Sequence, residues 1–434
     1  MSDRAIVVGA GIAGLSAALL LARRGSQVDI FEASEQLGGL LEPVLHDGIA
    51  CDRGSHRVHP ESHPLLMELT QEAQWQNKIR AGRLILNGRQ LSYPLDPFRF
   101  VRGLGAQTTL AMAKGWLLRP RSFKRALRWE SDRHHVVEDE GFESFVVRRV
   151  GSAAYSGFYE PYARKVWGID PSGLSQTVAK QRVSTSNPLN SILKKTVRHF
   201  LYPEHGMAAL IDLLRSKVED AGVQIHVGRR FEREELGRAP VFYTGHLGSL
   251  VPDAKLSHRG LYLLHITVDA GSLDDTDTWY TPEARYWFGR VSQPGRFSAQ
   301  LSRPGQQVIC VEIPEGQWGP EQNFVDQIDE VMAQLHHASI VKGAVKPMSV
   351  QQTFIERVYP MYVRDWVVEQ RRVLSEVAAS GPVFPCGRQG LFLHCNMDHA
   401  VATAAAAVEH WQAGGTSEQW AVQCRQFANF RVRD

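Results

Sequence analysis

Four residues near the start of the chain, Gly9, Gly11, Gly14 and Glu32, have the types and the spacing that binding a dinucleotide requires. Gly9 permits a tight turn, Gly11 lets backbone N–H groups approach a pyrophosphate, and Gly14 lets a helix pack closely on a strand. The N-terminus of that helix faces the phosphate charge and stabilises it through free N–H groups. Glu32 can accept hydrogen bonds from the ribose hydroxyls of an adenosine. The pattern therefore predicts a bound dinucleotide.

A second group of residues that could carry chemistry is the histidine-rich stretch from Gly54 to His63. His56 and His59 could position or protonate a substrate, because an imidazole is easily held in either protonation state near neutral pH. The alternative is that both are loop histidines bonded to the backbone. A zinc site needs a converging third or fourth ligand, which no spacing in the sequence supplies, so we expect no metal.

The segment Pro385–Ala400 combines glycines with charged residues. A helix that begins near Asn396 would aim its free N–H groups at an anion, and Arg388 adds a positive charge. The alternative is that Asn396 and Asp398 only cap the helix. The density of glycine and arginine favours contact with a cofactor over capping alone.

The glycine motif needs a strand, a helix and a second strand to position it. The apolar run Arg4–Val8 predicts the first strand, Ile12–Ala22 the helix, and Gln27–Phe31 the second strand, which ends at Glu32. Strand, glycine turn, helix, strand and acid therefore follow one another at the required spacing, which makes the motif more specific than its glycines alone.

A glycine pair, Gly38 and Gly39, lies a few residues beyond the second predicted strand. Without side chains these residues let the backbone pass close to a cofactor, although a Gly-Gly pair is also common in ordinary turns. Together with the Gly9–Glu32 unit, the pair resembles the glycine-pair motif of the FAD-binding amine oxidase and protoporphyrinogen oxidase superfamily. The resemblance implies that the dinucleotide is FAD and not NAD. Those families usually carry Arg beside the glycines, where this chain has Leu37 and Leu40.

The order of elements along the chain predicts an α/β fold with interleaved domains. We expect a Rossmann-type, glutathione-reductase-like FAD-binding lobe, a β-rich substrate lobe and a helical insertion. The expected boundaries are 1–93, 202–258 and 381–434 for the three parts of the FAD-binding lobe, 94–201 for the helical insertion and 259–380 for the substrate lobe. The helix candidates of the insertion are Phe98–Lys114, Arg121–Arg133, Gly141–Arg149 and Ala153–Val166. Short alternating runs predict strands of the substrate lobe at Leu261–Val268, Arg285–Val291 and Gln307–Ile313.

The composition is that of an ordinary globular enzyme. With 434 residues, 43% hydrophobic residues and a net charge of +3, the chain can bury a large core and is only mildly basic. The five cysteines are scattered and odd in number, which disfavours a disulfide framework and fits a reducing compartment. The sequence shows no signal peptide, no apolar run of the roughly 20 residues that span a membrane, and no nucleic-acid-binding signature. We therefore expect a soluble, cytoplasmic protein without a transmembrane segment or a nucleic-acid partner.

Short motifs spread over nearly the whole chain are similar to the layout of the flavin-dependent UDP-galactopyranose mutases. They are Gly54-Ser55-His56, Tyr202-Pro203-Glu204-His205-Gly206, Tyr243-Thr244-Gly245, Phe288-Gly289-Arg290-Val291, Val311-Glu312-Ile313-Pro314, Val358-Tyr359-Pro360, and Gly387-Arg388 followed by Asn396-Met397-Asp398. This chain differs from the mutases at Phe392 and His394, where they favour tyrosine, and at Arg259-Gly260, where they have a Tyr-Arg-Ser stretch.

The resemblance implies a set of site residues. FAD contacts are implied at Gly54, His56, Gly387, Arg388, Asn396, Met397 and Asp398, and the Tyr243-Thr244-Gly245 motif adds Thr244. Arg290 and Tyr359 are implied to face an anionic substrate. The candidate catalytic residues are therefore His56, Arg290 and Tyr359.

The stretch Lys114–Arg133 interleaves basic residues with aromatic and aliphatic ones. It could make peripheral contact with an anionic membrane or meet an acidic partner. The alternative is an ordinary solvated helix face whose aromatic residues turn inward. The sequence leaves the oligomeric state open.

We expect an FAD-dependent oxidoreductase that removes a hydride equivalent from a small-molecule substrate, as the superfamily resemblance implies. A first alternative is a redox-neutral, flavin-dependent sugar-nucleotide mutase of the UDP-galactopyranose type, in saccharide biosynthesis. A second is a non-catalytic flavin-binding scaffold. One fold supports several chemistries, so the substrate, anionic or nucleotide-linked, is left open by the sequence.

Overall fold

The apolar run Arg4–Val8 forms β1, a central strand of a five-stranded parallel sheet, and four of its five side chains are buried. Burial on both faces is typical of parallel strands, because helices cover both sides of such sheets. The strand order is β16-β10-β1-β2-β9, with β2 at Gln27–Phe31, β9 at Gln224–His226, β10 at Val241–Tyr243 and β16 at Val383–Pro385. Each neighbouring pair is parallel. Strands from the start, middle and end of the chain share one sheet, which confirms the predicted Rossmann-type α/β fold.

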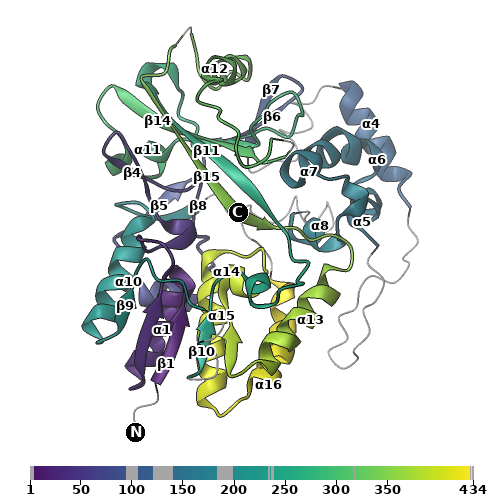
Figure 1. Cartoon of the computed structure of the whole chain (residues 1–434). Coiled ribbons are helices and arrows are strands. Elements are labelled where there is room, and N and C mark those ends of the chain that lie inside the picture. The colour runs from purple at the N-terminus through teal and green to yellow at the C-terminus, as the bar shows by residue number, and fades with distance from the viewer. Residues whose placement is uncertain are drawn as a thin grey trace.

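The helices of this sheet bring the two ends of the chain together. Helix α1 (Ile12–Arg23) packs against α10 (Ala208–Asp220) and α15 (Met397–Gln412). Figure 1 shows this contact as purple and yellow ribbons side by side in the lower half of the molecule. The alanine-rich sequence of α15 suits a close approach, since its small side chains allow helices to pack tightly. The computed structural model describes residues 4–93, 106–120, 140–182, 199–232, 235, 239–316, 318–343, 345–430 and 432.

A seven-stranded sheet forms the upper half of the molecule in Figure 1. Its order is β15-β11-β14-β13-β12-β6-β7, and only the β12–β6 pair is parallel. The strands are β6 (Gly82–Leu86), β7 (Arg89–Tyr93), β11 (His258–Asp269), β12 (Thr278–Tyr280), β13 (Arg290–Ser292), β14 (Gln306–Pro314) and β15 (Ser349–Pro360). Strands β6 and β7 belong to this sheet, although the sequence analysis placed their residues in the first FAD-binding part. The pairing of β6 with the distant strand β12 leaves no local signal in the sequence. The domain boundaries themselves stay predictions.

A largely helical block lies beside the seven-stranded sheet, at the right of the molecule in Figure 1, as the sequence predicted. It contains α4 (Ala106–Leu117), α5 (Phe142–Val150), α6 (Ser152–Ala154), η2 (Tyr155–Tyr159), α7 (Glu160–Trp167), η3 (Pro171–Gly173) and α8 (Gln176–Arg182). The predicted helix Arg121–Arg133 and the start of Phe98–Lys114 lie outside the described residues. The other elements are β3 (Val44–His46), β4 (Ile49–Cys51), α2 (Pro64–Leu69), β5 (Trp75–Ile79), β8 (His199–Pro203), α11 (Pro294–Phe297), α12 (Ile328–His337), α13 (Trp366–Ala379), α14 (Gly387–Gly390) and α16 (Ser417–Gln423), with short 3-10 turns η1 (Gly39–Leu41), η5 (Leu247–Leu250), η6 (Ala270–Ser272), η7 (Ala299–Leu301) and η8 (Cys424–Asn429).

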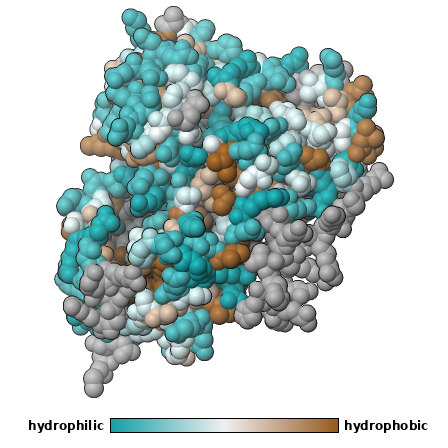
Figure 2. Space-filling model, turned by 45° about the vertical axis from the view of Figure 1, so that its right-hand side comes forward, coloured by the Kyte–Doolittle hydropathy of each residue, from teal (hydrophilic) through white to brown (hydrophobic). Residues whose placement is uncertain are grey.

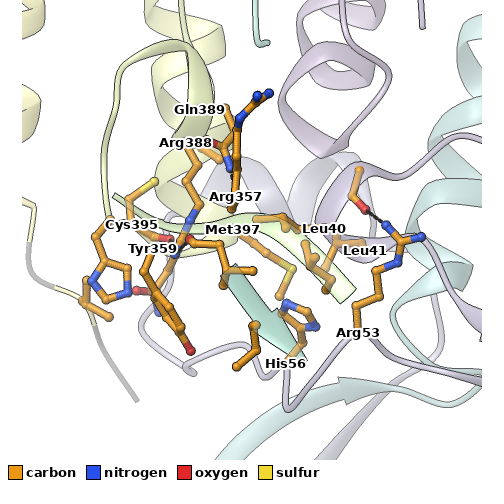
Figure 3. Close-up of a pocket in the computed structure, with 18 of the residues that line it drawn as sticks. Leu40, Leu41, Arg53, His56, Arg357, Tyr359, Arg388, Gln389, Cys395 and Met397 are labelled. Atoms are coloured by element: carbon orange, nitrogen blue, oxygen red, sulfur yellow. Dashed lines mark hydrogen bonds between the residues drawn. The ribbon is translucent and has the colours of Figure 1, made fainter. Parts of the chain in front are cut away.

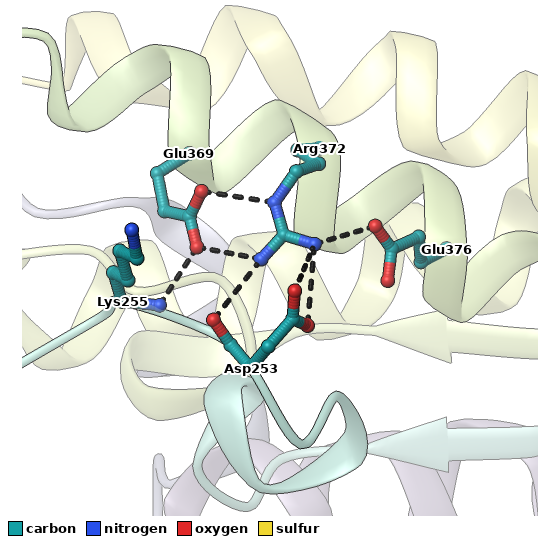
Figure 4. Close-up of polar contacts among 5 residues, drawn as sticks. All are labelled: Asp253, Lys255, Glu369, Arg372 and Glu376. Carbon is teal, nitrogen blue, oxygen red and sulfur yellow. Dashed lines mark hydrogen bonds and ion pairs between the residues drawn. The ribbon is translucent and has the colours of Figure 1, made fainter.

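Helix α13 returns from the seven-stranded sheet to the five-stranded one. Its Val373 and Leu374 side chains belong to the same buried core as β10 and β16. On its outer surface Arg372 bonds Glu369 at 2.8 Å, Glu376 at 2.6 Å and the carboxylate of Asp253 at 3.4 Å (Figure 4). These ion pairs are solvent-exposed and contribute little stability each, so the buried side chains hold the helix in place.

Two further expectations concern the cysteines and membrane-spanning helices. All five cysteines are buried and unpaired, which agrees with the predicted lack of a disulfide framework. Among the helices that the structure describes, none combines the length and the apolar character that crossing a bilayer requires.

Candidate functional site

A cavity of about 820 Å³ lies where the five-stranded sheet, the seven-stranded sheet and the helical block meet. It runs from the turn after β1 to the residues around Arg290 on β13. Figure 3 shows part of its lining, with Tyr359 on one side, Arg53 on the other and His56 between them. The cavity is therefore shared by all three parts of the fold, and no single part encloses it.

The glycine turn after β1 forms one end of the cavity. Gly9 has a φ of 93°, a conformation that favours glycine, and Gly9 and Gly11 both line the cavity. Gly14 does not line it. A Cβ added at Gly14 would lie far inside van der Waals contact with the Gly9 carbonyl oxygen. Gly14 thus lets α1 start directly under the turn, and the first residues of α1, Ile12 and Ala13, lie in the cavity wall.

Glu32 lies beside this turn, at the end of β2. Its carboxylate accepts hydrogen bonds from the backbone N–H of Ala10 at 2.7 Å and of Ser34 at 2.9 Å. The glycine pair joins the same cluster, since Gly38 donates to the Ala10 carbonyl at 3.0 Å and forms a β-bridge with Gly11. The two glycine motifs, separate in the sequence, therefore form one backbone surface at the cavity wall.

Arg53 is a cavity residue that the sequence reasoning missed. Its Nη1 donates to the Gly39 carbonyl at 3.2 Å, and its Nη2 pairs with Glu42 at 2.6 Å. It brings a guanidinium to the glycine pair, where Leu37 and Leu40 stand in place of the usual arginine. A signal was present, since Arg53 directly precedes the Gly54-Ser55-His56 motif.

Arg290 lies on the wall of the cavity and is held by Glu312 on β14. The pair is bidentate, with Nε and Nη2 each 2.7 Å from a carboxylate oxygen, and Glu312 is only 2% exposed. Burial lowers the pKa of Arg290, but the Glu312 carboxylate together with Tyr359 and Tyr280 outweighs burial and raises this pKa well above the usual range. The same carboxylate accepts the backbone N–H of Ser55 at 3.0 Å. Glu312, which we did not predict as a site residue, thus fixes both Arg290 and the turn that carries His56.

His56 points into the cavity as a neutral imidazole. Burial, together with the charges of Arg290 and Arg388, lowers the pKa of His56 to about 3. Its Nδ1 atom is buried and has no hydrogen-bond partner among the described residues. Buried polar atoms are rarely left without a partner in native proteins, so an orphaned Nδ1 indicates that a bound group completes this site.

Tyr359 on β15 lies on the side of the cavity opposite Arg53. Its ring packs edge-on against Trp167 at 5.8 Å and against His394 at 5.9 Å between ring centroids. Trp167 is the last residue of α7, and Arg259 donates to its carbonyl at 2.7 Å. The C-terminal end of a helix is a favourable place for a cation. Arg259 and His394, two positions where the chain differs from the mutase pattern, therefore support the rings around Tyr359.

The segment 387–398 contributes both lining residues and supports. Arg388 donates to the carbonyl of Val358 at 2.6 Å and of Cys395 at 2.9 Å, so it ties β15 to the start of α15. Asn396 is the N-cap of α15 in a capping box, as the capping alternative predicted, and also lines the cavity. Asp398 instead accepts the backbone N–H of His63 at 2.8 Å.

The structure brings most of the predicted site residues to one cavity. The lining includes Gly9, Gly11, Glu32, Gly38, Gly39, His56, Thr244, Arg290, Tyr359, Arg388, Asn396 and Met397. Four predicted residues do not line it: Gly14, Gly54, Gly387 and Asp398. The three glycines instead permit close packing. A Cβ at Gly387, for example, would lie 2.8 Å from the Ala13 Cβ. The assignment of individual roles stays a prediction.

Aromatic side chains of the helical block line the end of the cavity beyond His56. Phe158, Tyr159 and Tyr162 all line it, and the Phe158 and Tyr162 rings are parallel within 8° at 6.2 Å. Tyr280 on β12 completes this wall. We call this end the aromatic chamber, defined by Phe158, Tyr159, Tyr162 and Tyr280. Sequence reasoning predicted the helices but not which of their rings face the cavity.

A family model described as flavin containing amine oxidoreductase matches residues 12–234, just over half of the chain. The chain belongs to the flavin-containing amine oxidoreductase family. Membership confirms the predicted superfamily and FAD as its cofactor. The structure fits that cofactor on its own grounds, because a side-chain-free turn, an acid at the end of β2 and His56, whose buried Nδ1 has no partner among the described residues, all belong to the lining of one cavity.

The chain is similar to relatives with different names. The chain is 29% identical over 179 residues to protoporphyrinogen oxidase 2, chloroplastic/mitochondrial, of Arabidopsis thaliana, covering 40% of this chain and 34% of the plant protein. It is 25% identical over 249 residues to the probable UDP-galactopyranose mutase of Klebsiella pneumoniae, covering 56% of this chain and 60% of the bacterial protein. The chain thus matches less than two thirds of the length of either relative.

Solved structures with the same fold include a mutase and an oxidase. A crystal structure of reduced UDP-galactopyranose mutase matches with a TM-score of 0.81 and 18% identity, covering 100% of both chains. Putrescine oxidase bound to putrescine matches with a TM-score of 0.61 and 14% identity, covering 95% of this chain and 99% of the oxidase. At these identities the similarity establishes the fold.

Proposed function

We propose that this protein is an FAD-dependent oxidoreductase that acts on a small anionic molecule bound in the aromatic chamber. The observation that carries the proposal is the continuity of one cavity from the glycine turn at Gly9 to Arg290 and the chamber. When bound, FAD accepts the electron pair that leaves the substrate. Cofactor and substrate can then meet beside His56, away from bulk water.

Arg290 is proposed to hold the anionic group of the substrate. Glu312 occupies its Nε and Nη2 atoms, whereas Nη1 makes no hydrogen bond to any described residue. A guanidinium that is already fixed by a bidentate partner loses little conformational entropy when it binds an anion. Tyr359 lies near enough for its hydroxyl to affect the pKa of Arg290, so it is the second proposed contact with the same group.

His56 is proposed to orient its ligands through hydrogen bonds and not through charge. Because its pKa is lowered to about 3, the ring is neutral at physiological pH and offers one N–H donor and one acceptor. The rings of the aromatic chamber exclude water, which strengthens each polar contact inside it. Binding, orientation and water exclusion are thus what the chain supplies to the reaction.

The experiment is an anaerobic titration of the purified FAD-bound protein with candidate anionic substrates, followed by the flavin absorbance. An oxidoreductase predicts bleaching of the oxidised flavin by its substrate. Product that forms only with dithionite-reduced protein, without net reoxidation, would reject this proposal. A protein that cannot retain FAD at all would reject catalysis of either kind and favour a scaffold.

The second candidate is a redox-neutral mutase that acts on a sugar nucleotide. Its support is the basic lining of the cavity, to which Arg57 and Arg80 contribute beside Arg290, because a pyrophosphate needs several positive charges. The parallel rings of Phe158 and Tyr162 offer a flat surface for a base. The reduced protein incubated with UDP-galactopyranose distinguishes this candidate, since only the mutase converts the sugar ring without consuming reductant.

A further inference from the structure

Helix α4 exposes an apolar face that the proposed function does not use. Leu110, Leu117 and Leu118 are 71%, 58% and 71% exposed, and Lys114 lies on the same face. Leu110, Lys114 and Leu117 follow one another at intervals of four and three residues, so they form one stripe along the helix. Among the described residues, ten large hydrophobic side chains are exposed, and three of them lie within these nine positions.

The opposite face of α4 is packed and holds the helix firmly. Met112 packs against the buried cluster of Leu84, Leu86 and Leu91, which also includes Phe158 and Tyr280 of the aromatic chamber. A Cβ added at Gly115 would lie 3.2 Å from the Ala153 Cβ, so α4 also lies close against α6. Because the opposite face of α4 is packed against the core, the orientation of the helix is fixed and its leucines must face the solvent.

We propose that this face of α4 docks onto an anionic lipid bilayer. We define the α4 surface as Leu110, Lys114, Leu117, Leu118 and Arg119. Interfacial helices combine an apolar stripe, which enters the acyl boundary, with basic residues that meet anionic headgroups. The segment 106–120 contains Lys114 and Arg119 and no acidic residue. In Figure 2 hydrophobic side chains gather at the upper right, where α4 lies.

A second copy of the chain fits this surface less well than a bilayer does. A stable protein interface buries about 800 Å² per partner and takes roughly 20–30 residues from each side. The exposed stripe belongs to a single helix of 12 residues, about 18 Å long. Two such surfaces would also place Lys114 and Arg119 of both copies against each other, which like charges oppose.

Docking through α4 would bring the aromatic chamber to the bilayer. Met112 and Phe158 lie in one buried cluster, and Phe158 also lines the cavity. The helix that meets the lipid is therefore one layer of side chains away from the proposed substrate site. The docking proposal itself depends only on the α4 surface and not on the reaction.

The test is co-sedimentation of the FAD-bound protein with vesicles of equal parts phosphatidylglycerol and phosphatidylcholine. We expect binding at low salt, at least ten-fold weaker binding to pure phosphatidylcholine vesicles, and release by 0.5 M NaCl, since salt screens the headgroup attraction. The triple variant L110S/L117S/L118S should bind at least ten-fold more weakly, and K114Q roughly five-fold more weakly, with unchanged FAD content.

The matched control is L45S/I79S. It replaces two large aliphatic side chains on β3 and β5, away from α4, that are 69% and 71% exposed. The control should bind vesicles as the unaltered protein does. Absence of binding to the anionic vesicles at low salt, or equal binding by the triple variant, would overturn the proposal. So would a dimer, measured by light scattering, that the triple variant converts to a monomer, because the leucines would then cover a second copy.

Discussion

The two ends of the cavity are built in different ways. At the glycine end the wall is backbone, provided by Gly9, Gly11 and Gly38 within one short stretch of chain. At the Arg290 end the wall consists of side chains from β12, β13, β15, α7 and η2, which are far apart in the sequence. A side chain added at Gly9 or Gly38 would collide with neighbouring atoms, so this wall can hardly be altered by substitution. A wall built of side chains can instead change its charge or shape through single substitutions. The contrast is consistent with one fold being found in proteins as different as an oxidase and a mutase.

The largest effect is expected from Gly14→Ala at the glycine end. The added methyl would collide with the Gly9 carbonyl, so the turn must shift, at a cost of about 1–3 kcal/mol in the free energy of unfolding. We expect the FAD affinity to fall at least ten-fold, measured by the flavin-to-protein absorbance ratio. Gly173→Ala is the control, because its added Cβ would lie 3.9 Å from the nearest atom, in Ile169. Full FAD content in the Gly14→Ala protein would contradict the backbone account.

His56→Ala is the next prediction and tests the junction of the two ends. Removal of the neutral imidazole should lower kcat/KM about 100-fold, the lower end of the range for loss of one positioned hydrogen-bond donor. His56→Gln, which keeps a donor and an acceptor, should recover part of the loss. The measurement is steady-state kinetics on protein matched for FAD content. Equal rates for both variants would show that His56 acts through something other than hydrogen bonding.

Glu312→Gln probes the support of the substrate end. It leaves the Arg290 guanidinium, whose side chain is 28% exposed, without its carboxylate. Removal of one partner of a buried pair costs roughly 3–5 kcal/mol, and the partial exposure of Arg290 reduces our expectation to about 2 kcal/mol in the free energy of unfolding. Urea denaturation measures it. Glu376→Gln, at the exposed ion pair of Arg372, should cost less than about 0.5 kcal/mol. Equal costs would refute the distinction between buried and exposed pairs.

A pH dependence follows from the lowered pKa of His56. The unfolded imidazole takes up a proton near pH 6.5, whereas the folded one does so only near pH 3. The unfolded state therefore binds more protons in this interval, and the free energy of unfolding falls by up to about 1.4 kcal/mol per pH unit as the pH drops from 6.5 towards 3. Denaturation of the unaltered protein and of His56→Gln at pH 7 and pH 5 gives the difference. Parallel losses in the two proteins would show that His56 titrates normally.

The smallest effect is expected from Tyr359→Phe. The ring keeps its packing on Trp167 and His394, and only the hydroxyl near Arg290 is lost. A hydrogen bond to a charged group contributes about 1.5–3 kcal/mol, and we take the lower end of this range, so we expect a roughly ten-fold rise in KM with little change in kcat. A fall in kcat with constant KM would instead assign Tyr359 to the chemical step.

Local motifs were read correctly from the sequence. The strand, turn, helix and second strand around Gly9 form as predicted, because each depends on nearby residues and on the free conformations of glycine. The helix at Met397–Gln412 begins next to Asn396, where its cap was expected. FAD followed from the resemblance of the Gly9–Glu32 unit and the Gly38–Gly39 pair to the motifs of FAD-binding families, and membership of the family confirms it.

Other expectations failed where distant residues dominate. The predicted strand Arg285–Val291 is wrong over most of its length, since β13 covers only Arg290–Ser292. The residues before it form a turn in which Lys165 of α7 donates to the carbonyls of Thr281 and Phe288. A lysine more than 100 residues away cannot be anticipated from alternating hydrophobicity. Glu312 was missed for the same reason, because it also holds Ser55, which lies 257 residues away.

The sequence was sufficient for a bound dinucleotide and for the class of fold, since the Gly9–Glu32 unit needs only short-range geometry, and the resemblance of the Gly38–Gly39 pair to an FAD-binding motif added the identity of the cofactor. The substrate end depends on long-range contacts: Glu312 orients Arg290, and burial beside Arg290 and Arg388 keeps His56 neutral. A pKa and a side-chain direction are properties of the surroundings of a residue and not of its type. The exposed stripe of α4 likewise became visible only when packing of Met112 showed which face is left for solvent.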